Sequence, residues 1–139
     1  MRVVKLFSVV IACALVCAAI AFLPEKLCFE SGESYTFYCG TSSADCKEVT
    51  VKEHAEATKL CLKEVCGEAT VYTNFDLQSF LKSSGAKIVA VEELSDSVNY
   101  YCTADLPYSV NLYGTKINLH ISVRGDSAKV ASPIIFGGY

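Results

Sequence analysis

Apolar residues run almost without a break through the first part of the chain. Behind two basic residues near the N-terminus, residues 6–23 carry a single clearly polar side chain. A basic start, an apolar stretch and the small residues at 19–21 are typical of a secretory signal, although a run of this length also reaches the lower limit for a membrane span. We therefore predict that residues 1–21 are a cleaved signal peptide or a retained membrane anchor; lipid attachment at Cys13 is a third alternative.

Beyond this segment, apolar and polar side chains alternate in several short runs. Such alternation is the pattern of strands that bury one face. It predicts a strand at 34–39 with a partner at 46–51, and further strands at 87–93, 97–104 and 115–124.

The clearest alternation lies at residues 115–124. The side chains expected to face the core are Ile117, Leu119, Ile121 and Val123. The side chains expected to face water are Asn118, His120 and Ser122. Another strand is expected to begin at Ala128, so Arg124-Gly125-Asp126-Ser127 should form a tight turn with Gly125 and Asp126 at positive φ.

Two helices are predicted between the strands. Residues 73–76, Thr-Asn-Phe-Asp, are typical of a helix start capped by the threonine, and Gly85 marks the expected end. Residues 51–66 have apolar positions spaced by four and three, which predicts a helix, whereas residues 59–65 also alternate in the manner of a strand.

The order of these elements predicts an α+β fold. We expect residues 22–139 to form a single domain, because a chain of this length normally builds one core. The expected architecture is a small antiparallel sheet of four to six strands, meander-like in its C-terminal half, with one or two helices on one face.

Charge argues against one class of partner. Residues 22–139 contain 10 basic and 15 acidic residues, a formal charge of −5. Neutralising phosphates requires clustered basic side chains, and no window of this sequence contains such a cluster. We therefore expect no nucleic-acid partner, and contact with a membrane only through residues 6–23 if they are retained.

Six of the eight cysteines belong to the predicted domain. An even number in a small exported domain is typical of a disulfide framework. The candidates are Cys28, Cys39, Cys46, Cys61, Cys66 and Cys102. The loop at 40–45 favours a bridge between Cys39 and Cys46, and buried free thiols are the alternative. Because no C-x-x-C motif occurs, neither a metal site nor a redox-active dithiol is expected, and no cofactor is predicted.

The last third of the chain resembles a known family. A helix, hairpin strands and a Gly turn precede Lys-Ile-Asn-Leu-His-Ile-Ser-Val-Arg at 116–124, and Ser-Pro-Ile-Ile follows at 132–135. This order is similar to the C-terminal part of the YwmB-like exported proteins of Gram-positive bacteria. The resemblance implies a fold of the TATA-box-binding-protein type, without DNA binding and without an assigned activity. The cysteine-rich first half and the ending at 136–139 depart from that family.

Few residues suggest catalysis. The chain has two histidines, His54 and His120, and it contains no G-x-S-x-G elbow and no phosphate-binding glycine loop. Alternation places His120 beside Asn118 on one face, which is either a polar site or a solvated sheet face.

The eight tyrosines exceed the needs of a core of this size. Tyrosine is favoured where one side is apolar and the other is wet. The candidate binding residues are Tyr101, Tyr108, Tyr113, Asn118 and His120. The alternative interpretation is that these tyrosines only shield the second face of the sheet.

Together these features predict an exported, envelope-associated binding or structural module that is not an enzyme. The first alternative is a small extracytoplasmic hydrolase or thiol enzyme that uses His120 or a free cysteine. The second alternative is an adhesin, because Arg124-Gly125-Asp126-Ser127 matches an integrin-binding sequence. The predicted partner is an unidentified envelope or extracellular molecule.

Overall fold

The computed structural model describes residues 2–21, 26–42 and 44–137. The N-terminal helix α1 (Arg2–Ala21) exposes its described side chains, residues 8–19. Within the described part of the chain, no helix combines the length and the hydropathy needed to cross a bilayer. The boundary after residue 21, and the choice between signal peptide and anchor, stay predictions.

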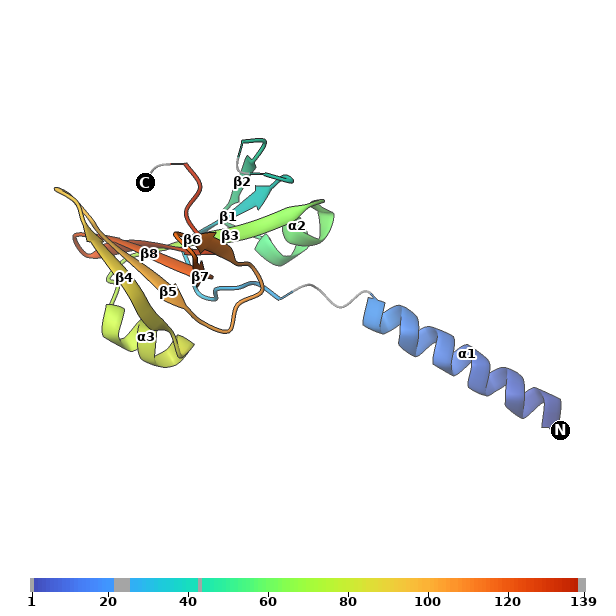
Figure 1. Cartoon of the computed structure of the whole chain (residues 1–139). Coiled ribbons are helices and arrows are strands. Elements are labelled where there is room, and N and C mark those ends of the chain that lie inside the picture. The colour runs from blue at the N-terminus through green and yellow to red at the C-terminus, as the bar shows by residue number, and fades with distance from the viewer. Residues whose placement is uncertain (1, 22–25, 43, 138–139) are drawn as a thin grey trace.

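Among the described residues, seven strands form one antiparallel sheet and two short strands form a separate hairpin (Figure 1). The strand order of the large sheet is β2-β1-β3-β9-β8-β5-β4. The strands are β1 (Ser34–Cys39), β2 (Lys47–Val51), β3 (Val65–Tyr72), β4 (Lys87–Glu93), β5 (Val98–Thr103), β6 (Val110–Leu112), β7 (Thr115–Ile117), β8 (Leu119–Arg124) and β9 (Ser127–Ser132). The α+β prediction is confirmed, with a larger sheet than the four to six strands expected.

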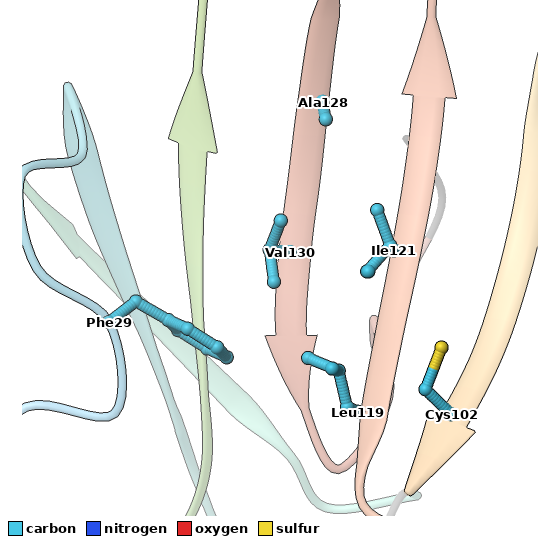
Figure 2. Close-up of a cluster of buried hydrophobic side chains, with 6 residues drawn as sticks. All are labelled: Phe29, Cys102, Leu119, Ile121, Ala128 and Val130. Atoms are coloured by element: carbon cyan, nitrogen blue, oxygen red, sulfur yellow. The ribbon is translucent and has the colours of Figure 1, made fainter. Parts of the chain in front are cut away.

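One face of the large sheet, here called the helix face, carries the main apolar core. Figure 2 shows its buried side chains, which come from β5, β8, β9 and the segment before β1: Phe29, Cys102, Leu119, Ile121, Ala128 and Val130. Helix α3 (Leu77–Ser84) covers this cluster with Phe80 and Leu81.

Helix α2 (Ala55–Cys61) lies on the same face. Its Lys59 forms an ion pair with Glu68 of β3. Alternation along β3 puts Glu68 on the same side as Tyr72, whose ring packs 6.0 Å from that of Phe80. Both helices therefore lie on one side of the sheet, as predicted.

The opposite face, here called the tail face, is covered by segments from the C-terminal half. Ile135 and Phe136 pack against Tyr38, Ala69 and Ala131 on the central strands. The β6–β7 hairpin covers another part of this face, and the hairpin's last residue is only 2% exposed. Both faces of the sheet are therefore covered over the central strands.

This second layer buries the polar row of β8 and corrects one expectation. Asn118 and His120 are each 8% exposed, and Ser122 is 3% exposed. The prediction that they face water was wrong, although Leu119 and Ile121 do lie on the other face. Alternation within a strand shows which residues share a face, but it does not show that a distant segment covers that face.

The single strand expected at 115–124 is two strands, β7 and β8. The interruption falls at Asn118, whose side chain bonds to the backbone of Ala104. Its Oδ1 accepts from the Ala104 N–H at 2.7 Å, and its Nδ2 donates to the Ala104 carbonyl. The Asn118 N–H still donates to the Cys102 carbonyl at 3.2 Å, so the side-chain bonds to Ala104 are additional contacts at the point where the chain passes from the hairpin into the sheet.

The helix ends also differ from expectation. Asp76 caps α3 in place of the threonine at 73, because its carboxylate accepts from the Ser79 N–H at 3.1 Å. Gly85 ends α3 with φ 65°, as predicted. Helix α2 is shorter than the 51–66 segment, since β2 continues to residue 51 and β3 already begins at residue 65.

The turn between β8 and β9 matches the predicted hairpin, with Arg124 opposite Ser127. Gly125 has φ 60°, whereas Asp126 is not at positive φ, which corrects the expectation for that residue. Glycine at the first central position is the pattern of a type II′ turn. The tetrapeptide is therefore explained by backbone geometry alone.

Replacing Gly125 by alanine is expected to lower the free energy of unfolding by about 1–2 kcal/mol, because an L-residue is strained in this conformation. An added Cβ would meet no atom within 4 Å, so the loss comes from the backbone and not from crowding. Urea unfolding measures it. Equal stability of the G125A and wild-type chains would refute the turn assignment.

Candidate binding site

A groove of about 490 Å³ opens on the tail face between β4 and the β6–β7 hairpin. We call it the tyrosine groove. Its lining includes Val89 and Glu92 from β4, Tyr101 from β5, and Leu112 and Tyr113 from the hairpin. A β-bulge in β4 sets Val89 and Ala90 together opposite Tyr101. The groove thus joins an apolar floor to a single carboxylate.

Tyr101 is held inside the groove by two neighbours, one of which also contacts Asn99. Its ring stacks on His120 with 4.6 Å between centroids, and its hydroxyl donates to Glu92 Oε2 at 3.1 Å. Asn99 Nδ2 lies 3.4 Å from the same oxygen. Burial raises the pKa of the Tyr101 phenol and the Glu92 carboxylate reinforces the shift, so the hydroxyl stays a neutral donor.

Tyr113 stands fully exposed at the mouth of the groove, in the turn of the hairpin. Its backbone has φ 50°, a conformation that is uncommon for a bulky residue. Gly114 beside it has φ 82°, and positive φ at both central residues is what a two-residue type I′ hairpin turn requires. The turn therefore holds an aromatic ring in water beside an apolar groove.

His120 lies beneath this groove and is not part of its surface. Its Nδ1 accepts from the Ile135 N–H at 3.2 Å, and its Nε2 lies 3.3 Å from Asn99 Oδ1. Burial lowers the pKa of the imidazole to about 4, against the opposing field of Glu92. His120 is a neutral side chain with both nitrogens engaged.

The other two predicted site residues lie elsewhere. Asn118 is used up in backbone bonds to Ala104. Tyr108 points its hydroxyl at Glu68 Oε1, 3.4 Å away on the helix face. The structure thus brings Tyr101 and Tyr113 together at one groove. His120 lies under the groove and packs against Tyr101, whereas Tyr108 lies outside it.

A buried ion pair is the main polar cluster that sequence reasoning missed. Lys59 Nζ lies 2.5 Å from Glu68 Oε1, and both side chains are 4% exposed. Glu68 Oε2 accepts from the Cys28 N–H at 2.9 Å, and Lys59 donates to the Lys26 carbonyl at 2.9 Å. The pair therefore ties the segment before β1 to α2 and β3, which is a structural use of buried charge.

The cysteines do not support the predicted disulfide framework. Within the described residues, all eight are free thiols. The expected Cys39–Cys46 bridge is not formed, because the β1–β2 register sets Lys47 opposite Cys39. Cys46 instead packs with Cys66 against Tyr38 on the tail face.

Several of these thiols are poor nucleophiles. Burial raises the pKa of Cys28 to about 12 and that of Cys102 to about 11. Desolvation also raises the pKa values of Cys39 and Cys46. Since the thiolate is the reactive form, these four side chains stay largely unreactive at neutral pH.

No group of three or more His, Cys, Asp or Glu side chains in the described part of the chain is placed to hold a metal ion. Comparison with family models, curated proteins and solved structures finds no match to this chain. The geometry of the tyrosine groove therefore carries the functional argument alone.

One feature of the sequence points to the groove in retrospect. Residues 87–93 are a strand without clean alternation, because Ile88, Val89 and Val91 place apolar groups at neighbouring positions. All seven residues of β4 are exposed. An apolar strand at an open sheet edge is typical of an interaction surface.

Proposed function

We propose that residues 22–139 are an exported, non-enzymatic binding module of the cell envelope, and that the tyrosine groove binds an extended polypeptide segment. The observation that carries this proposal is the apolar groove beside the free edge of β4. The resemblance of the last third of the chain to exported YwmB-like proteins supports export and gives no support to an activity.

The edge of β4 favours an extended ligand. In the described part of the chain, β4 ends the large sheet and pairs with β5 alone. A peptide strand added there would receive backbone hydrogen bonds from β4, and alternate side chains would turn toward the groove. The bulge at Val89 confines regular pairing to a short stretch, which limits uncontrolled edge-to-edge association.

The charge of the edge favours a basic ligand. Glu92 and Glu93 end the strand and are both exposed. The predicted domain is acidic overall. The ligand chemistry that fits is an extended segment that alternates apolar and basic side chains, with binding weakened by added salt.

Two observations weigh against the alternatives. An enzyme that uses His120 as a base needs a free ring nitrogen, and Nδ1 and Nε2 already have partners. An adhesin needs its arginine for a receptor, and Arg124 Nη2 lies 2.9 Å from Asp96 Oδ2. The binding-module proposal has no such conflict.

Replacing Val89 by asparagine is expected to weaken binding of a basic, apolar peptide at least tenfold, a loss of about 1.4 kcal/mol, because it puts a polar side chain into the apolar floor without adding a charge that would attract the peptide. The probe is a capped hexapeptide that alternates lysine with apolar residues and includes one tryptophan; the chain contains no tryptophan, so peptide fluorescence is unobscured.

Ile88 supplies the matched control. It is 44% exposed, as Val89 is, but it pairs with Cys102 and so faces the helix side of the same strand. Ile88→Asn is expected to bind the peptide as the wild type does. If peptide binding were weakened equally in both variants, the effect on the strand would be nonspecific. That result would reject the groove as the binding surface.

A further inference from the structure

The C-terminal residues 133–137 lie across the tail face as a strap. Ile135 and Phe136 pack against Tyr38, Ala69 and Ala131. The Phe136 ring meets the Tyr38 ring edge-on, with 4.9 Å between centroids and 71° between planes. The strap thus hides an apolar surface on the central strands.

A hydrogen bond to His120 holds the middle of the strap. The Ile135 N–H donates to Nδ1 at 3.2 Å, and Nε2 faces Asn99 Oδ1 at 3.3 Å. Asn99 turns its Nδ2 toward Glu92, which fixes its Oδ1 toward the ring. Since Oδ1 only accepts, the imidazole proton is on Nε2 and the lone pair on Nδ1 receives the strap.

The same geometry leaves no place for a second proton. An imidazolium carries N–H groups on both nitrogens, so Nδ1–H would confront the Ile135 N–H, and two donors cannot bond. Burial lowers the pKa of His120 from 6.5 to about 4, in the direction that this arrangement requires.

We propose that the strap is an acid-released cover: uptake of one proton from solvent at His120 Nδ1 breaks the bond to Ile135, and residues 133–137 then leave the tail face. Release exposes the surface formed by Tyr38 and its neighbours. The device does not depend on the peptide bound by the tyrosine groove.

The charged and titratable groups around His120 are few. Tyr101 of β5 stacks on its ring, and Glu92 of β4 is the carboxylate that opposes the pKa shift. On β9, Ala131 lies opposite His120, and Lys129 pairs with Ser122 on the same face. The Arg124–Asp96 pair lines a cavity of about 400 Å³ that also reaches His120 and Ile135. The strap contributes no charged side chain.

The direction of the pH dependence follows from the lowered pKa. The closed state binds its proton only near pH 4, and we take the ordinary histidine pKa of 6.5 for the open state, in which the strap no longer buries the imidazole. The closed strap is therefore fully favoured above pH 6.5 and loses stability as the pH falls toward 4. Because opening takes up one proton, the equilibrium constant for opening of the strap rises about fiftyfold between pH 7 and pH 4.5.

Amide hydrogen exchange of Ile135 tests the device in the intact chain. After correction for the intrinsic rate, protection of this amide is expected to fall by about fiftyfold between pH 7 and pH 4.5. Amides of β8 and β9 should keep their protection over that range. Protection that does not change with pH, or that falls together with the sheet, would overturn the proposal.

Two variants distinguish protonation of His120 from protonation of a nearby carboxylate as the cause of strap opening. His120→Gln is expected to make Ile135 protection independent of pH, while His54→Gln, at the other histidine, should keep the wild-type profile. If His120→Gln retains the pH dependence, a carboxylate such as Glu92 drives it and the proposal fails. Should that variant not fold, the wild-type comparison of Ile135 with the sheet still decides.

Discussion

Substituting Glu68 by alanine is expected to lower the free energy of unfolding by about 3–5 kcal/mol. The change takes the Glu68 carboxylate away from the buried Lys59 ammonium, and both side chains are 4% exposed in the native chain. It also removes the acceptor for the Cys28 N–H, which anchors the segment before β1. Urea unfolding at pH 7 measures the loss.

An exposed ion pair provides the control. Lys26 and Glu30 lie 3.7 Å apart with side chains 84% and 73% exposed, so Glu30→Ala should cost less than about 0.5 kcal/mol. The double variant Lys59→Met with Glu68→Leu should recover most of the loss, because it removes both buried charges. A loss for Glu68→Ala no larger than that for Glu30→Ala would contradict the buried pair.

Substituting Ile121 by alanine is expected to cost about 2–5 kcal/mol, the range for deleting a fully buried aliphatic side chain. Ile121 is 0% exposed and lies between Tyr100 of β5 and Val130 of β9 on the helix face. The matched control is Ile88→Ala, since Ile88 is 44% exposed on the edge strand. Thermal or urea unfolding compares the two variants.

The contrast between these isoleucines tests the sheet order. If Ile88→Ala were the more damaging change, β4 would not lie at the exposed edge of the sheet. That outcome would contradict the arrangement on which the tyrosine groove depends.

Local features of the fold were predictable because they depend on residues that are close together in the sequence. The alternation of residues 34–39 gave β1 with its observed bounds, and Gly85 ends α3 as expected. The turn at Gly125 also follows from local chemistry. Prediction failed where two neighbouring residues suit the same role. The threonine at 73 and Asp76 are both good N-cap residues, and the structure uses Asp76, not the predicted threonine, to cap α3.

Features that depend on distant contacts were not predictable. The polar row at His120 is buried by residues near the end of the chain, and no periodicity in β8 encodes that cover. The Lys59–Glu68 pair forms between a helix and a strand whose packing the sequence does not specify. Tyr101 and Tyr113 of the tyrosine groove come from separate elements of the fold. The composition therefore suggested a tyrosine-containing site but did not show which tyrosines lie together.

Shift mapping by NMR tests the central claim, that the tyrosine groove is the binding surface, most directly. A panel of capped hexapeptides alternating basic and apolar residues is titrated into the labelled domain. At least one peptide is predicted to saturate shifts confined to β4 and the β6–β7 hairpin, with Val89 and Tyr113 among the largest. Shifts centred on the Lys59–Glu68 pair or on the strap, or no saturable shift with any peptide, would contradict the account.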